Sequence, residues 1–151
     1  MAPTDTPRHT ASSHMADALA EARAAGERGE VPVGAVIVGA DGTVLARAGN
    51  RTRAEIDPTA HAEIMAIREA CRTLGSERLT GADLYVTLEP CPMCAAAISF
   101  ARIRRLYWGA GDPKGGGVEH GGRFFSQPTC HHAPEVYGGI EEVRSGALLR
   151  T

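Results

Sequence analysis

The sequence has 151 residues, a formal net charge of −2 and a pI of about 6.3. This length suits one domain with a single core, and the near-balanced charge excludes a strongly basic nucleic-acid-binding protein, although a local basic patch is compatible with it. Four cysteines are too few for a disulfide scaffold, and no stretch approaches the roughly 20 apolar residues of a membrane span, so we expect a cytoplasmic protein.

The first predicted element is an amphipathic helix over about residues 13–27. Its apolar positions recur at helical spacing: Met15, Ala18, Leu19 and Ala22. Gly26 or Gly29 can end the helix. Residues 1–12 lack the apolar run of a signal peptide and are expected to form a disordered arm. The single domain then covers residues 13–151.

A β-hairpin is predicted next. Residues 33–38 are almost entirely apolar, residues 40–42 form an Ala-Asp-Gly turn, and residues 43–48 resume an extended pattern. The two strands are expected to be adjacent and antiparallel.

A second helix is expected to open at Asp57-Pro58, with Asp57 as its N-cap and Pro58 at the first helical position. Gly75 is expected to end it. Four residues at helical spacing predict its buried face: Ile64, Ile67, Cys71 and Leu74.

The rest of the chain alternates between strands and helices. The predicted elements are a strand over 84–88, a helix opened by Pro92, a strand over 105–108, a fifth strand over 135–138 and a final helix over 143–150. A strand, helix, strand passage with a short crossover implies parallel pairing. The expected fold class is therefore α/β, with three α/β/α layers around a mixed five-stranded sheet. The glycine-rich residues 109–122 predict a mobile loop near the functional site.

The strongest functional signal is His61-Ala62-Glu63 followed by Pro90-Cys91-Pro92-Met93-Cys94. This H-x-E and P-C-x-x-C pattern is the signature of zinc-dependent nucleobase deaminases. We predict that His61, Cys91 and Cys94 hold one Zn²⁺ per chain, because an imidazole with two thiolates favours zinc. The two helix N-termini that carry these residues are expected to meet at the carboxyl ends of the preceding strands.

Three protein ligands leave one coordination position for water, which is typical of a catalytic zinc site. Glu63, which no structural zinc site requires, is predicted to move protons from the activated water to the ring nitrogen and the departing amine. The alternative is a closed structural site whose fourth ligand comes from elsewhere in the chain: Cys71, Cys130, His131 or His132.

Several stretches around the zinc motif match one family. They are 30–36 (E-V-P-V-G-A-V), 49–51 (G-N-R), 57–66 (D-P-T-A-H-A-E-I-M-A), 84–94 (L-Y-V-T-L-E-P-C-P-M-C), 101–105 (A-R-I-R-R) and 109–116 (G-A-G-D-P-K-G-G). On these stretches the chain resembles bacterial tRNA adenosine deaminases of the cytidine-deaminase-like superfamily. The resemblance implies the cytidine-deaminase-like fold and hydrolytic deamination of adenosine to inosine at the wobble position of a tRNA anticodon loop.

The resemblance also implies substrate contacts and a partner. Asn50 would hydrogen-bond the nucleoside. Val33 and Gly34 would form the pocket wall, and Asp112 with Lys114 would line its nucleic-acid side. The family works as homodimers, and the helix at Ala95-Ala96-Ala97 with Phe100 is a candidate seam. A basic cluster is compatible with either a phosphate-binding patch or a solvated surface: Arg102, Arg104 and Arg105.

Two alternatives remain open from the sequence. Pro92 between the two cysteines also suits deaminases of a free base or nucleoside such as guanine, adenine or cytosine. A zinc-stabilised binding module without turnover is the other, although it leaves Glu63 without a role. The sequence ends at Leu148-Leu149-Arg150-Thr151, short of the aromatic and basic C-terminal helix that would help to grip a tRNA, so weak RNA affinity is expected.

Overall fold

The computed structural model describes residues 7–150 of the chain. Its elements in chain order are α1 (Pro7–Glu27), β1 (Gly34–Val38), β2 (Val44–Gly49), α2 (Ala62–Leu74), β3 (Asp83–Leu88), α3 (Pro92–Phe100), β4 (Arg105–Ala110), the short 3-10 helix η1 (Phe124–Ser126), β5 (Glu135–Tyr137) and α4 (Glu142–Leu149). The predicted hairpin, the later strands and the final helix are confirmed.

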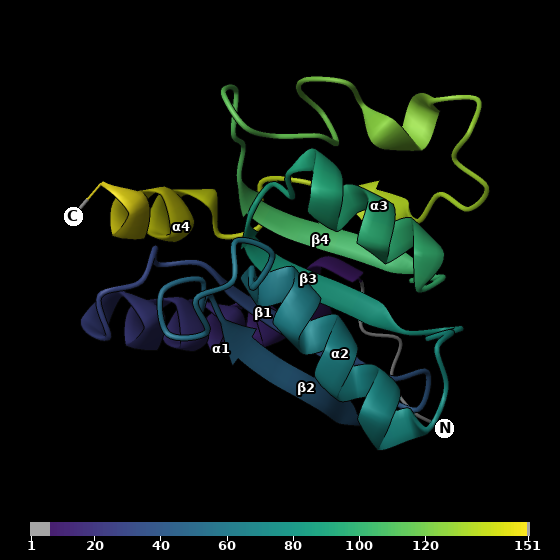
Figure 1. Ribbon diagram of the computed structural model, residues 1–151, viewed down its shortest axis with the longest axis horizontal. Helices are drawn as coiled ribbons and strands as arrows, with labels where there is room; N and C mark the ends of the chain where they lie inside the picture. Colours follow the sequence, from purple (N-terminus) through teal and green to yellow (C-terminus); the bar gives the residue numbers. More distant parts are fainter. Residues whose placement is uncertain (1–6, 151) are drawn as a thin grey trace.

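The five strands form one mixed sheet in the order β2-β1-β3-β4-β5. Strand β1 pairs antiparallel with β2 and β3, whereas β3, β4 and β5 run parallel to one another. Helices α2 and α3 cover one face, and α1 covers the other with α4 beside it (Figure 1). The predicted three-layer α/β/α architecture is therefore confirmed.

Two apolar cores lie on the two faces of the sheet. Under α2 and α3, the core includes Ala66, Leu84 and Ile98, all fully buried. On the opposite face, Met15 and Leu19 of α1 pack with tyrosines of the sheet. Within residues 7–150, no helix combines the length and the apolar character needed to cross a membrane.

Helix α1 begins earlier than the sequence predicted. It starts at Pro7 rather than near residue 13, so residues 7–12 of the predicted disordered arm lie in the helix, and residues 1–6 lie outside the described residues. Proline is well tolerated in a first helical turn, where its missing N–H leaves no hydrogen bond unmade. The other end is as expected: the helix stops at Glu27, and Gly29 adopts a left-handed φ of 86°.

Helix α2 corrects two predictions. It begins at Ala62 with His61 as N-cap, not at Pro58 with Asp57 as N-cap. The Asp57 carboxylate instead accepts from the backbone N–H of Thr59 at 2.8 Å and from its hydroxyl at 2.7 Å, which closes a turn before the helix.

The buried face of α2 also differs from the prediction. It consists of small residues and one acid: Ala62, Glu63, Ala66 and Ala70. Alanines allow the helix to lie close to the sheet, so the larger Ile64 lies beside α3, in a groove, and Leu74 is 50% exposed. Ile67 lines the same groove but also packs against the core, as predicted. Cys71 packs against the edge of the core as predicted, and Gly75 ends the helix with φ 73°.

The strand register places several predicted site segments at one edge of the sheet. Gly34 at the start of β1 pairs with Gly49 at the end of β2, and the Gly34 N–H donates to the Thr87 hydroxyl near the end of β3. Leu88 pairs with Ala110, so β3 and β4 end together. The segments that follow β2, β3 and β4 therefore leave the sheet on the same side.

Candidate metal and catalytic site

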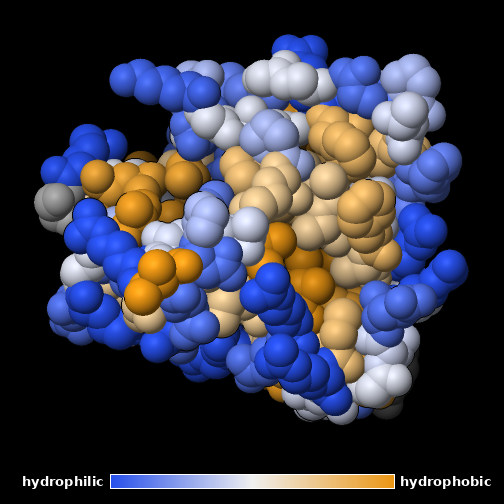
Figure 2. Space-filling model, in the orientation of Figure 1, coloured by the Kyte–Doolittle hydropathy of each residue, from blue (hydrophilic) through white to orange (hydrophobic). Residues whose placement is uncertain are grey.

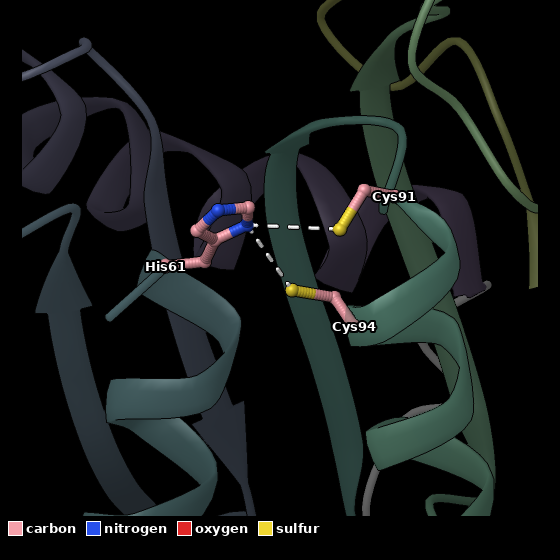
Figure 3. Close-up of side chains that lie close together, drawn as sticks. All are labelled: His61, Cys91 and Cys94. Carbon is pink, nitrogen blue, oxygen red and sulfur yellow. Dashed lines mark hydrogen bonds between the residues drawn. The ribbon is translucent and has the colours of Figure 1, made fainter. Parts of the chain in front are cut away.

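The three predicted metal ligands converge at this edge. His61 is the N-cap of α2 and Cys91 the N-cap of α3, while Cys94 lies in the first turn of α3. His61 Nδ1 lies 3.7 Å from Cys91 Sγ and 3.5 Å from Cys94 Sγ, and Figure 3 shows the imidazole pointing between the two sulfurs. All three ligand atoms lie within 4.8 Å of one another.

These distances fit a tetrahedral zinc ion. Zn–S bonds of about 2.3 Å and Zn–N bonds of about 2.0 Å at tetrahedral angles separate the nitrogen and sulfur ligands by about 3.5 Å. The donor set, one imidazole and two thiols, is also the one that zinc prefers. His61, Cys91 and Cys94 therefore form the candidate zinc site.

The two cysteines differ in acidity. A hydrogen bond from the Cys94 thiol lowers the pKa of Cys91 to about 5, although burial opposes this. That same hydrogen bond and burial raise the pKa of Cys94. Both cysteines bind zinc as thiolates, so metal binding must displace the proton that the two sulfurs share.

Glu63 lies beside the ligands in the first turn of α2. It is 4% exposed, so its carboxyl group is almost completely shielded from solvent. Burial raises the pKa of Glu63 to about 7. A carboxyl group with a pKa near neutrality can both take up and release a proton at physiological pH, which suits an acid/base role.

The closed-site alternative does not fit the geometry. In the part of the chain that the structure describes, His61, Cys91 and Cys94 are the only group of three or more potential ligands that lies close enough to hold a metal ion. The proposed fourth ligands lie elsewhere. Cys130 donates to the carbonyl of His132 at 3.1 Å, and the His132 ring bonds the Ile103 carbonyl at 2.7 Å, so this loop packs on the far end of α3.

Asn50 and Val33 lie together next to the site. The Asn50 N–H donates to the Val33 carbonyl at 3.1 Å, and the Asn50 side chain is buried, with its amide donating to the Thr52 hydroxyl at 3.3 Å. Gly34 has a different neighbour: a Cβ atom there would collide with the backbone of α1 at Ala18 and Ala22. The glycine is therefore required by close helix packing, and only its backbone is available to a pocket.

Asp112 and Lys114 lie in the glycine-rich loop after β4. The Asp112 carboxylate accepts from the N–H groups of Lys114 at 3.2 Å and Gly115 at 2.9 Å, and the Lys114 side chain is exposed. The described structure records no direct contact between these two side chains and the metal ligands. Their connection to the metal site runs through Glu89.

Glu89 is a site residue that the sequence did not predict. It follows β3, two residues before Cys91, and its carboxylate is completely buried. Burial opposes ionisation, but the N–H groups of Asp112 and His120 lower the pKa of Glu89 to about 2. A sequence signal was present, because an acid directly after the buried run L-Y-V-T-L needs internal partners.

The basic cluster lies away from the site. Arg104 makes two hydrogen bonds of 3.1 Å to Asp83, and Arg105 lies 3.6 Å from Glu135. These residues lie at the starts of β3 and β4, opposite the edge that carries the metal ligands. Solvated ion pairing is the better interpretation of this cluster.

Comparison with known proteins identifies several similar chains. The family model for the cytidine and deoxycytidylate deaminase zinc-binding region matches residues 8–110. A tRNA-specific adenosine deaminase of Agrobacterium fabrum is 73% identical over 133 residues, which cover 88% of this chain and 87% of that protein.

Two solved structures are also similar. One comes from a study of A-to-I editing by tRNA:A34 deaminases at the wobble position of transfer RNA; it is 71% identical, covers 91% of this chain and 99% of its own, and has a TM-score of 0.89. The other, guanine deaminase from Bacillus subtilis, is 41% identical over 66% of this chain and 63% of its own, with a TM-score of 0.63.

Proposed function

We propose a function from the family to which the chain belongs, the cytidine and deoxycytidylate deaminase zinc-binding family, and within it the tRNA-specific adenosine deaminases. The proposed reaction is the conversion of adenosine to inosine at the wobble position of a tRNA anticodon loop. The buried Glu63 beside the ligand triad carries the proposal, because a zinc site with three protein ligands has a position for water and Glu63 is placed to move its protons. Since tRNA is the substrate, the expected compartment is the cytoplasm.

The reaction replaces the exocyclic amine of adenine by oxygen. A zinc ion held by His61, Cys91 and Cys94 would supply a Lewis acid that makes water acidic enough to serve as the nucleophile near neutral pH. Glu63 would accept the first proton that the water loses and deliver it to the adjacent ring nitrogen. It would then take the second proton from the hydroxyl newly bonded to the ring carbon and pass it to the amine, so that the C–N bond breaks and ammonia leaves. Its pKa of about 7 allows both directions of transfer.

The remaining predicted contacts would position the nucleotide. A base on which this chemistry occurs must leave the stack, which an anticodon loop permits at little cost. Asn50 would hydrogen-bond the nucleoside beside a wall formed by Val33 and the backbone of Gly34. Asp112 and Lys114 would contact the RNA from the loop after β4.

Deamination of a free base is the second candidate. The similarity to guanine deaminase favours it, but that similarity covers about two-thirds of each chain, whereas the match to the Agrobacterium tRNA deaminase covers nearly nine-tenths at higher identity. The tRNA substrate is therefore the better supported of the two.

One preparation tests both candidates. The zinc-loaded protein is incubated with an anticodon stem-loop carrying a wobble adenosine, and inosine is read by sequencing. In parallel, ammonia release is measured with guanine, adenine, cytosine and adenosine. Inosine in the RNA without ammonia from the small molecules is the expected result, and the reverse pattern would replace the tRNA proposal with the free-base one.

We further propose that the protein is a homodimer that uses the groove between α2 and α3. Figure 2 shows a continuous apolar area over these helices, and a groove of about 410 Å³ is lined there by Ile64, Ile67, Ala97 and Phe100. Phe100 is 71% exposed, whereas Ala95, part of the predicted seam, is completely buried within its own chain. Arginines and Glu77 at the rim supply both charge signs, which suits self-pairing across a two-fold axis.

A further inference from the structure

The glycine-rich loop after β4 is folded around the carboxylate of Glu89. Oε1 accepts from the Asp112 N–H at 3.0 Å and lies 2.6 Å from His120 Nδ1, which must donate because a carboxylate only accepts. Oε2 accepts from three consecutive N–H groups, those of Val118 at 3.2 Å and of Glu119 and His120 at 2.9 Å. Both ends of the loop are therefore fastened to one side chain.

The same loop also rests on the metal-ligand segment. The Gly117 N–H donates to the Pro90 carbonyl at 2.8 Å. A Cβ atom on Gly117 would lie 2.7 Å from the backbone nitrogen of Pro92, and a Cβ atom on Gly116 would collide with the Glu89 carboxylate. Glycines at these two positions permit an approach that no other residue allows.

Within residues 7–150, every hydrogen bond recorded for the Glu89 side chain comes from the loop after β4. Its side chain is fully buried, and an ionised carboxylate in such a place is tolerated only when it is thoroughly hydrogen-bonded. Five donors from the loop provide this, so the loop conformation and the Glu89 charge depend on each other. Because Cys91 follows two residues later, the arrangement joins the loop rigidly to the zinc-binding turn.

We propose that Glu89 is a positioning residue for the RNA substrate: it fixes the Asp112–Lys114 segment relative to Cys91, so that the loop meets the anticodon backbone while the base reaches the metal site. This inference rests on the proposed function. Glu89 itself touches neither substrate nor metal. Its contribution is to the binding of RNA and not to the chemical step.

Glu89→Gln is the direct test, with Glu119→Gln as the matched control. A glutamine places an NH₂ group against two or three N–H donors, whichever way it is turned, and releases the loop. Glu119→Gln removes a charge from the same loop, but the Glu119 side chain is exposed, and only its backbone N–H contacts Glu89. His120→Ala is a milder variant, because it removes one of the five hydrogen bonds and keeps the buried charge.

Hydrogen exchange gives a readout that needs no substrate. In the zinc-loaded wild type, the amides of Asp112, Val118, Glu119 and His120 are expected to exchange slowly. In Glu89→Gln these amides should exchange at least about tenfold faster while those of β1 and β3 stay unchanged. Glu119→Gln should match the wild type. Equal protection in Glu89→Gln and the wild type would overturn the proposal.

Kinetics on the anticodon stem-loop give the second readout. Glu89→Gln should raise KM by about tenfold and change kcat by less than about twofold, with one zinc per chain retained; His120→Ala should raise KM by about threefold. An unchanged KM, a fall in kcat at constant KM, or loss of zinc would each overturn the positioning role. A wild-type protein that fails to convert the RNA would instead remove the proposed function and leave the exchange result standing.

Discussion

Gly34 of β1 lies directly against the carbonyl oxygen of Ala18 in α1, with no space between them for a Cβ atom. We therefore expect Gly34→Ala to force α1 away from the sheet and to lower the free energy of unfolding by about 2–3 kcal/mol. Urea denaturation followed by circular dichroism measures this. Gly122→Ala is the control, because a Cβ atom there meets nothing within 4 Å. Equal midpoints for the two variants would contradict the close packing.

Replacing Glu63 should separate catalysis from metal binding. Glu63→Ala removes the proton carrier but none of the three ligands, so kcat should fall by about 10²- to 10⁴-fold while one zinc per chain remains. Zinc is measured by mass spectrometry on the same samples. Glu69→Ala on the exposed side of α2 should leave both quantities unchanged. Zinc loss in Glu63→Ala would show that the carboxylate supports the metal site.

The sequence predicted the layers, the mixed sheet and the ligand triad because these depend on patterns that the chain displays locally. The start of α2 was wrong for a physical reason: Asp57-Pro58 has helix-start chemistry, yet its aspartate caps a turn at Thr59. The buried face of α2 was missed because the helix lies so close to the sheet that only small side chains fit between them. The hydrophobic pattern of the sequence does not reveal the distance between the helix and the sheet. Glu89 was missed because its partners lie 23 to 31 residues away.

Acid should weaken the loop that follows β2 through Glu30. This side chain is 7% exposed and accepts from the N–H groups of Arg53 at 3.1 Å and Ala54 at 2.8 Å. Burial works against ionisation, but these hydrogen bonds and the charges of Arg28 and Arg53 lower the pKa of Glu30 below 4.5.

A carboxylate with a lowered folded-state pKa contributes stability above its unfolded pKa and loses it as the pH falls toward the folded value. The stability difference between the wild type and Glu30→Gln should therefore be constant from pH 7 to about pH 5.5 and shrink below about pH 4.5. Urea titrations at several pH values give this difference directly. A difference that stays constant down to pH 3 would contradict the assigned role.

Ile56 carries backbone strain on the surface. It has a φ of 50°, which is unfavourable for a β-branched residue, and its side chain is 91% exposed. Ile56→Asn should raise the free energy of unfolding by about 1 kcal/mol, because asparagine tolerates the left-handed region. Val31→Asn, at an exposed position without positive φ, should give no such gain. Thermal and urea denaturation measure the free energy of unfolding of both variants. An equal change in the two variants would contradict the assignment of strain to Ile56.

A charge placed in the groove between α2 and α3 should separate the dimer. Phe100→Glu replaces an exposed aromatic side chain of the groove by a carboxylate, which removes apolar contact and would have to lose its water on pairing. Light scattering after size exclusion should give a dimer for the wild type and a monomer for Phe100→Glu. Val143→Glu alters an exposed apolar residue on α4, which is 80% exposed against 71% for Phe100, and this variant should remain dimeric. A monomeric wild type would remove the homodimer proposal.

His61 precedes Cys91 by 30 residues and Cys94 by 33, and the three meet only through the pairing of β1 with β3. During synthesis the histidine emerges well before either sulfur, and no metal ion finds its full set of donors until that pairing is complete. Metallation is consequently a late event in the maturation of the chain. A chain in which β1 and β3 have not yet paired therefore offers zinc only part of its ligand set.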